Sequence, residues 1–118
     1  MKILVVDDEE LDLFINNKLL SLEFDTAGFT SSKDAVLWAQ TNDFDVAMID
    51  YYLGPGIFAE NLLRELIALK GLTFKAFVVS NYVDEKQTMD LKQAGFHEII
   101  YKPLTLETFK MKLAMLDK

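Results

Sequence analysis

Five polar side chains of the sequence are of the types that support phosphate chemistry around a divalent metal ion. They stand after short apolar runs, as Asp7, Asp8, Asp50, Ser80 and Lys102. Three carboxylates gathered at one site would repel each other, and at about 4 Å and an effective dielectric constant near 20 each pair would cost up to ~4 kcal/mol. A lysine and a divalent cation would offset that repulsion. Carboxylate ligands without a neighbouring His or Cys favour Mg²⁺, with Mn²⁺ as the alternative, over zinc.

A site of this kind could transfer a phosphoryl group to one of its own carboxylates. A carboxylate beside the metal can attack phosphorus and become an aspartyl phosphate, while a hydroxyl and an ammonium group meet the phosphoryl oxygens. Each residue alone has a more common structural explanation, such as an acid at a helix N-terminus, a turn residue or an exposed lysine. The chemistry therefore depends on whether the fold brings the five side chains together.

Short apolar runs alternate with helical patterns along the chain. Strands are expected at 3–6, 24–29, 46–49, 74–79 and 99–101, and each is followed by a helix, at 11–22, 31–40, 58–69, 84–94 and 105–116. Residues 53–56 have the composition of a loop. Five strand–helix units predict a doubly wound α/β domain with one parallel sheet, right-handed crossovers and helices on both faces. In such a sheet the polar residues that end the strands line the crevice where the ligand binds.

Apolar stripes and capping residues add detail for individual helices. In the first helix the apolar positions at helical spacing are Leu11, Phe14, Ile15, Leu19 and Leu22. In the last helix the side expected to face the sheet carries Leu106, Phe109, Leu113 and Leu116, and the opposite side carries Met111 and Met115. Helix N-caps are expected at Ser31 or Ser32 and at Thr105, and helix ends at Gly71 and Gly95.

The composition is that of one globular domain over residues 1–118. Hydrophobic residues are 51% and charged residues 26%, which argues against a disordered chain. The sequence has no Cys, no secretory signal and no apolar run near the roughly 20 residues of a membrane span, so a cytoplasmic protein that does not contact membranes is expected. The net charge of −7 opposes direct binding to the phosphate backbone of a nucleic acid.

The polar residues at the strand ends resemble the set found in the receiver domain of two-component response regulators. Their order along the chain is Asp7-Asp8, Asp50, Ser80 and Lys102-Pro103, with intervals of 42, 30 and 22 residues from Asp8 onward. The resemblance covers essentially the whole chain. It implies a stand-alone receiver with a flavodoxin-like (βα)5 fold and a five-stranded sheet of strand order 2-1-3-4-5.

The resemblance also implies a metal site. Asp8 corresponds to a direct Mg²⁺ ligand, and Asp7 to a ligand bound directly or through water. The carboxylate of Asp50 and the backbone carbonyl of Tyr52 would complete the protein ligands. All four positions lie at or just past the ends of two expected strands.

The phosphoryl site follows from the same resemblance. Asp50 corresponds to the phosphoacceptor, and Ser80 to the hydroxyl residue that is drawn to the phosphoryl group. Lys102 would pair with Asp50 or with the phosphoryl group. In this family the peptide bond before the matching proline is usually cis, so a cis bond is expected between Lys102 and Pro103.

Several positions depart from the family pattern. Ile99 stands where the family usually has Phe or Tyr, and whether Tyr101 on the same strand face replaces that switch residue is open. Asn81 stands where the family prefers a small residue. Together with Tyr52 and Tyr82, which flank the site in sequence, Asn81 is expected to set the lifetime of the phosphorylated form.

The leading hypothesis is a signalling module and not an enzyme with an external substrate. A histidine kinase or a histidine phosphotransfer protein would supply the phosphoryl group, and a shift between two conformations would reach a partner. The last expected helix reaches the end of the sequence at Lys118, so the chain is expected either to act by docking or to be an excised domain. The face made by the fourth helix, fifth strand and fifth helix, with Tyr101, Met111 and Met115, is the expected contact for a downstream protein or a second copy.

Three alternatives are weaker. A Mg²⁺-dependent phosphohydrolase that forms an aspartyl phosphate would want Asp-x-Asp after the first strand, where the sequence has Asp7-Asp8-Glu9. A flavodoxin-type redox protein would need a phosphate-binding loop rich in Ser, Thr or Gly at that point. A degenerate receiver would not keep the full acid set. The single histidine, His97, is expected to be a solvated loop residue and not a phosphodonor.

Overall fold

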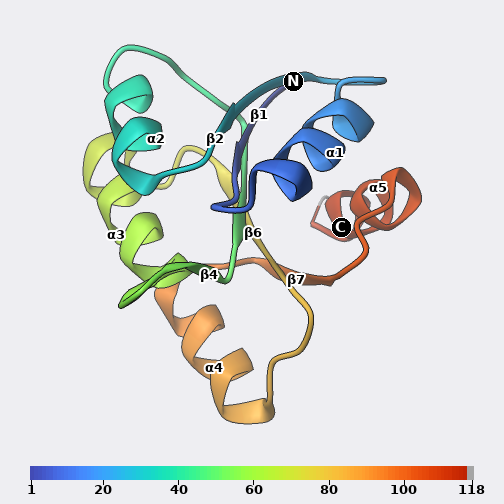
Figure 1. Ribbon diagram of the computed structural model, residues 1–118. Coiled ribbons are helices and arrows are strands. Elements are labelled where there is room, and N and C mark those ends of the chain that lie inside the picture. The colour runs from blue at the N-terminus through green and yellow to red at the C-terminus, as the bar shows by residue number, and fades with distance from the viewer. Residues whose placement is uncertain (117–118) are drawn as a thin grey trace.

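A computed structural model describes residues 1–116, and its centre is a five-stranded parallel sheet (Figure 1). The strands are β1 (Lys2–Val6), β2 (Asp25–Phe29), β3 (Val46–Asp50), β6 (Lys75–Ser80) and β7 (Glu98–Tyr101). Their order in the sheet is β2-β1-β3-β6-β7, and all neighbours pair in parallel. Counted along the five core strands this is the predicted order 2-1-3-4-5. Residues 117 and 118, the end of the predicted domain, lie outside the described residues.

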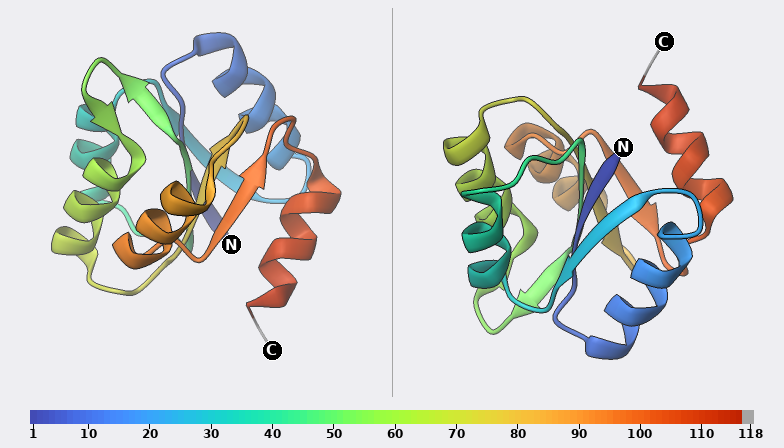
Figure 2. Two further views of the ribbon diagram at one scale, coloured as in Figure 1. Left: turned by 90° about the horizontal axis from the view of Figure 1, so that it is seen from below. Right: turned by 90° about the horizontal axis from the view of Figure 1, so that it is seen from above.

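Helices cover both faces of the sheet, as the alternating pattern predicts (Figures 1 and 2). One face carries α1 (Glu10–Leu20) and α5 (Leu106–Met115), and the other carries α2 (Ser32–Ala39), α3 (Ala59–Lys70) and α4 (Glu85–Ala94). Two apolar cores result, one on each side of the sheet. The central strand β3 is buried along its whole length, which fits the continuous apolar run at 46–49 that precedes Asp50.

The predicted helix caps are present. The Ser31 hydroxyl accepts a hydrogen bond from the Asp34 N–H at 3.1 Å, and the Thr105 hydroxyl accepts one from the Thr108 N–H at 3.0 Å. Gly71 and Gly95 follow α3 and α4 with φ angles of 68° and 121°. Only glycine adopts such angles readily, so these residues end the helices where the sequence indicated.

The predicted apolar stripe of the first helix is wrong. Four of its members are exposed: Leu11, Phe14, Ile15 and Leu22. The helix packs instead through Leu13 and Leu19, which are partly buried, and Leu20, which is fully buried, so Leu19 is the member of the predicted stripe that reaches the core. Gly28 on β2 permits the close approach of this side of the helix, because a Cβ atom there would lie 3.0 Å from Leu13 Cδ1. The helix approaches the sheet through the row that faces the glycine.

The last helix has the predicted orientation. Phe109 is fully buried, and Leu106, Leu113 and Leu116 pack partly buried against the same core. Met111 and Met115 are about half exposed on the other side, with 56% and 48% of their surface accessible.

The segment after β3 differs from the predicted loop. Residues 53–56 belong to a short antiparallel hairpin of β4 (Tyr52–Gly54) and β5 (Ile57–Phe58). Gly54 and Gly56, with φ angles of 130° and 75°, allow the reversal. The rings of Tyr51 and Tyr52 contact Phe58, so aromatic packing holds a hairpin that glycine and proline content alone did not reveal.

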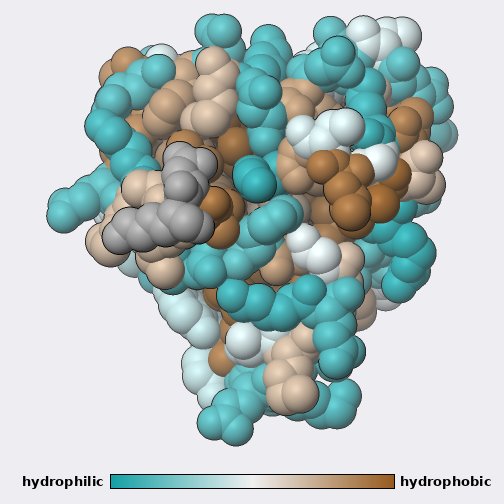
Figure 3. Space-filling view, turned by 180° about the vertical axis from the view of Figure 1, so that it is seen from behind, coloured by the Kyte–Doolittle hydropathy of each residue, from teal (hydrophilic) through white to brown (hydrophobic). Residues whose placement is uncertain are grey.

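The surface agrees with the acidic composition. Figure 3 shows the face opposite that of Figure 1, where hydrophilic side chains separate smaller apolar patches. Among residues 1–116, no helix combines the length and the apolar character that crossing a membrane requires.

Candidate functional site

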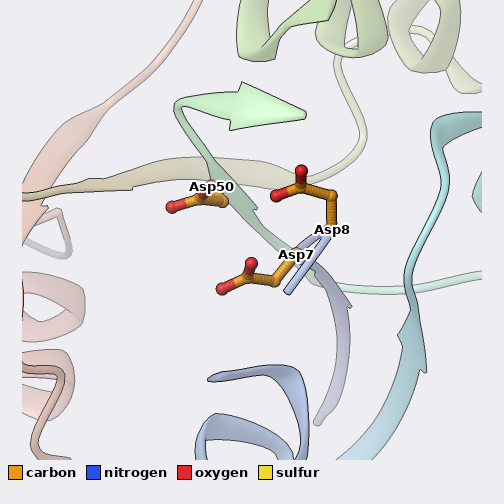
Figure 4. A group of neighbouring side chains, drawn as sticks. All are labelled: Asp7, Asp8 and Asp50. Carbon is orange, nitrogen blue, oxygen red and sulfur yellow. The ribbon is translucent and has the colours of Figure 1, made fainter. Parts of the chain in front are cut away.

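The structure brings the three predicted acids together at the carboxyl ends of β1 and β3. One ligand oxygen from each of Asp7, Asp8 and Asp50 can be chosen so that all three lie within 4.8 Å of one another. Figure 4 shows the three side chains around one space. Asp7 and Asp50 are buried, with 2% and 8% of their surface accessible, and Asp8 is half-buried.

The parallel register positions these acids. Val6 pairs with Ile49 and Asp50 pairs with Val79, so the residues that follow each strand emerge side by side. Main-chain hydrogen bonds extend the ladder past the strand ends, from the Asp7 N–H to the Phe29 carbonyl at 3.1 Å and from the Lys102 N–H to the Ser80 carbonyl at 2.9 Å. The backbone at the site is therefore held by the sheet and not by a free loop.

Burial leaves the two inner carboxyl groups difficult to ionise. Loss of solvent raises the pKa of Asp7 to about 6, although the Glu9 N–H donates to its Oδ1 at 3.0 Å and opposes the shift. Burial also raises the pKa of Asp50, and the hydrogen bond and charge of Lys102 oppose that shift. The neighbouring acids add to the rise in both cases, so the site favours any bound positive charge.

Lys102 forms an ion pair with Asp50, one of the clustered acids. Its Nζ lies 2.9 Å from Asp50 Oδ1. Burial alone would lower the pKa of Lys102, but the hydrogen bond that its ammonium donates to Asp50 and the charges of Asp50 and Asp7 outweigh that effect and raise the pKa. The Lys102–Pro103 peptide bond is cis.

A fourth acid at the site was missed by the sequence interpretation. Asp12 Oδ2 on α1 lies 3.6 Å from Lys102 Nζ. Asp12 stands four residues after Asp8 in the first turn of the helix, a spacing that places it above the same strand end. That spacing was the available signal, but an acid in the first turn of a helix is common for electrostatic reasons alone.

The three clustered carboxylates suit a hard cation. They offer oxygen ligands only, and a single lysine contacts one of them within the described residues. Mg²⁺ is bound in proteins by a few carboxylates and keeps other positions for water or phosphate oxygens. The chemistry of the donor set therefore fits Mg²⁺, whereas the Tyr52 carbonyl remains a predicted ligand.

Ser80 is buried at the end of β6, next to the acids in the sheet order. Its hydroxyl donates to the Tyr82 carbonyl at 3.2 Å, so it holds the following loop in place. Asn81 and Tyr82 are exposed. Asn81 lines a hollow of about 380 Å³ together with Lys102 and Asp12, which places it beside the site.

The two candidates for a switch residue on β7 lie in different environments. Ile99 is buried, with 7% of its surface accessible, in the core beneath α3 and α4. Tyr101 is 48% exposed and lines a surface depression with Tyr82 and Met89. An aromatic ring is thus on the surface, while the inner position holds an aliphatic side chain.

His97 is not the solvated residue that was predicted. It is partly buried, and its Nδ1 accepts a hydrogen bond from the Ala76 N–H at 3.0 Å. The main-chain N–H of His97 donates to the Ala76 carbonyl at 2.8 Å. His97 immediately precedes β7 and so continues the ladder with β6. Burial, aided by the charge of Lys75, lowers the pKa of His97 and favours the neutral ring.

The chain is similar to known proteins in sequence and in fold. The family model of the response regulator receiver domain matches residues 3–114. The chemotaxis protein CheY-3 of Vibrio cholerae is 30% identical over 116 residues, which are 96% of this chain and 88% of that protein. The solved structure of V. cholerae CheY4 has a TM-score of 0.83 at 18% identity, covering 97% of this chain and 96% of that one. A response regulator of Burkholderia pseudomallei, solved with a phosphorylated aspartic acid and a calcium ion, has a TM-score of 0.84 at 19% identity, covering 95% of this chain and 65% of that one.

Proposed function

The chain belongs to the family of response regulator receiver domains, and we propose that it accepts a phosphoryl group on Asp50 from a phosphohistidine. The observation that carries the proposal is the place of Asp50, whose carboxylate lies beside two other acids and 2.9 Å from the Lys102 ammonium. The donor would be a histidine kinase or a histidine phosphotransfer protein. The phosphorylated aspartic acid of the B. pseudomallei regulator supports the same chemistry.

The transfer uses Asp50 as the nucleophile. A carboxylate oxygen of Asp50 forms a bond to phosphorus as the bond from phosphorus to the imidazole nitrogen breaks, and the electron pair leaves with the ring. Lys102 stays close to the new phosphoryl oxygens and balances their charge. Asp7, Asp8 and Asp50 would hold Mg²⁺, or Mn²⁺, which supplies positive charge to the phosphoryl oxygens when bound. The carbonyl of Tyr52 is the further ligand that we propose.

Ser80 connects the site to the rest of the molecule. Its hydroxyl donates to the Tyr82 carbonyl in this structure, so it must release that carbonyl before it can donate to a phosphoryl group. This change would move the loop that carries Asn81 and Tyr82 into a second arrangement. Tyr101 shares a surface depression with Tyr82 and would meet the moved loop.

The same loop would control the lifetime of the phosphorylated form. Asn81 lines the hollow beside Lys102, and Tyr82 is 72% exposed next to it. We propose that both side chains, together with Tyr52, limit the access of water to phosphorus. Hydrolysis would thus depend on side chains that bind neither metal nor phosphate.

The output surface would be the face of α4, β7 and α5. Tyr101, Met111 and Met115 are each about half exposed there. Methionine side chains adapt to different partners because they are flexible and polarizable. We propose that this face binds a downstream protein or a second copy of the chain.

The donor protein would contact a different face. We propose that it touches Ile15 on α1, which is exposed and lines the hollow beside Lys102.

Intact-mass measurement after incubation with acetyl phosphate and Mg²⁺ tests the proposal. One added phosphoryl group is expected, and it should be absent from Asp50→Ala. Addition at a residue other than Asp50 would contradict the assignment. Sustained turnover of a generic phosphate ester, with no labelled aspartate, would instead favour the phosphohydrolase.

A further inference from the structure

Asp12 gives the site lysine a second carboxylate partner. Its Oδ2 lies 3.6 Å from Lys102 Nζ, while Asp50 Oδ1 lies 2.9 Å from the same nitrogen. The Asp12 side chain is 45% exposed, compared with 10% for Asp50. It belongs to α1 and lies outside the acid cluster that could hold a metal ion. Asp12 is thus an additional negative charge at the outer side of Lys102.

Asp12 also lines the hollow that leads to this lysine. The hollow has a volume of about 380 Å³, and its polar lining comes from Asp12, Asn16, Asn81 and Lys102. A phosphoryl donor that enters this hollow to reach Lys102 would lie close to the Asp12 carboxylate. Because Asp50 contacts the same lysine, the charge of such a donor would affect its approach to Asp50.

We infer that Asp12 is a specificity-determining residue that disfavours acyl phosphates relative to nitrogen-linked phosphoryl donors, the class to which phosphohistidine belongs. The inference rests on the proposed function of Asp50. Acetyl phosphate is a dianion at neutral pH, whereas phosphoramidate is protonated on nitrogen and has a single net negative charge. The Asp12 carboxylate repels the dianion more strongly.

The two donors transfer the same group by the same attack. In both cases a carboxylate oxygen of Asp50 forms a bond to phosphorus. With acetyl phosphate the P–O bond breaks and the electron pair leaves on acetate. With phosphoramidate the P–N bond breaks and ammonia leaves with the protons already on its nitrogen. The reactions therefore differ in the charge that the donor brings and in the leaving group.

Asp12 can influence phosphoryl transfer to Asp50 in two ways, and comparing acetyl phosphate with phosphoramidate separates them. By holding Lys102 it changes the position of the ammonium near Asp50, which affects both donors alike. By its own charge it acts on the donor, which affects the dianion more. The ratio of the two transfer rates removes the first effect and keeps the second.

If Asp12 acted only by stabilising α1, the neighbouring acid Glu10 would have the same effect. Glu10 is the other acid in the first turn of α1, and both favour the helix through its dipole. Glu10 lines a different surface hollow, with Phe14 and Gly28, and does not line the one beside Lys102. Glu10→Gln is therefore the matched control for Asp12→Asn.

The experiment measures the initial rates of Asp50 phosphorylation by acetyl phosphate and by phosphoramidate, with saturating Mg²⁺. The ratio of the acetyl phosphate rate to the phosphoramidate rate is expected to rise about threefold to fivefold in Asp12→Asn, because one half-exposed unit charge is removed from the path of the donor. Asp12→Glu, which keeps the charge, and Glu10→Gln should leave the ratio within about twofold of wild type. The increase should shrink at high ionic strength.

The outcomes distinguish this inference from the function on which it rests. If Asp12→Asn changes both rates by the same factor, or neither, the role in donor selection is overturned while the phosphoacceptor assignment stands. If Glu10→Gln shifts the ratio as much as Asp12→Asn does, a general effect of helix charge replaces the inference. If wild type is labelled by neither donor, the proposed function fails and the inference fails with it.

Discussion

Replacing Asp7 by Asn should stabilise the metal-free fold at neutral pH. Asp7 is 2% exposed, and burial raises the pKa of its carboxyl group from 3.8 to about 6. A carboxyl group with a raised pKa in the folded state disfavours folding wherever it is ionised. A difference of that size corresponds to about 3 kcal/mol of lost stability at pH 7. The Asn amide must also be buried, so we expect a gain of about 1–2 kcal/mol.

The sign of the pH dependence follows from the same shift. Between about pH 4 and pH 6 the folded state holds a proton on Asp7 that the unfolded state has lost, so the free energy of unfolding decreases as the pH rises through that range. The advantage of Asp7→Asn should be full at pH 7 and should disappear as the pH falls toward 4. The oxygen of the Asn side chain can still accept the hydrogen bond from the Glu9 N–H, so the turn before α1 is retained.

Urea denaturation at pH 7 and at pH 4.5, with EDTA and with excess Mg²⁺, measures these quantities. Mg²⁺ should stabilise wild type more than Asp7→Asn, because the ion offsets the buried charge and binds only the folded site. Glu9→Gln is the control, since Glu9 is the exposed neighbour and its side chain caps no helix among the described residues. If Asp7→Asn is less stable than wild type in EDTA at pH 7, the electrostatic account of the site is wrong.

Four further substitutions test other parts of the structure. Lys102→Met should slow labelling by acetyl phosphate about 100-fold, since it removes the ammonium group 2.9 Å from Asp50; a change below threefold would contradict its role. His97→Phe should lower the free energy of unfolding by about 1–3 kcal/mol, because the Ala76 N–H loses its acceptor; urea midpoints equal to those of wild type would rule this out. Wild type should also lose stability as the pH falls below about 6.5, because the unfolded state then binds a proton on His97 that the folded state does not. Asn81→Ala and Tyr82→Ala should change the half-life of the aspartyl phosphate measured by intact mass, and half-lives equal to that of wild type would refute their control of hydrolysis.

The strand ends could be predicted because each carries two signals at once. An apolar run such as Val46–Ile49 requires burial on both faces, and the first polar residue after it marks the edge of the sheet. Parallel pairing of β1 with β3 then places Asp7 beside Asp50 without any contribution from the loops. The site was therefore readable from local patterns together with one topological rule.

The features that were missed depend on contacts between distant segments. The side of α1 that faces inward could not be read from the helix alone, because its close approach to the sheet depends on the absence of a side chain at Gly28 on another strand. The environment of His97 likewise follows from its place opposite Ala76, twenty-one positions away. The hairpin at Tyr52–Phe58 depends on ring contacts that composition does not encode.

The electrostatic balance of the site suits a response of the loop after β6 to a change of charge at Asp50. Lys102 contacts the carboxylates of Asp50 and Asp12, and Asp7 and Asp8 lie beside Asp50. Asp7 and Asp50 are buried where ionisation is unfavourable. A site in that condition gains much from a bound cation, and we expect it to rearrange when a phosphoryl group adds further charge at Asp50. The Ser80 hydroxyl is committed to the Tyr82 carbonyl, a contact of modest strength that a charged acceptor can replace. The unfavourable burial of the acids and the response of the loop after β6 thus follow from one arrangement. Asp7→Asn, which removes one buried charge, should therefore also reduce the response of that loop to phosphorylation of Asp50.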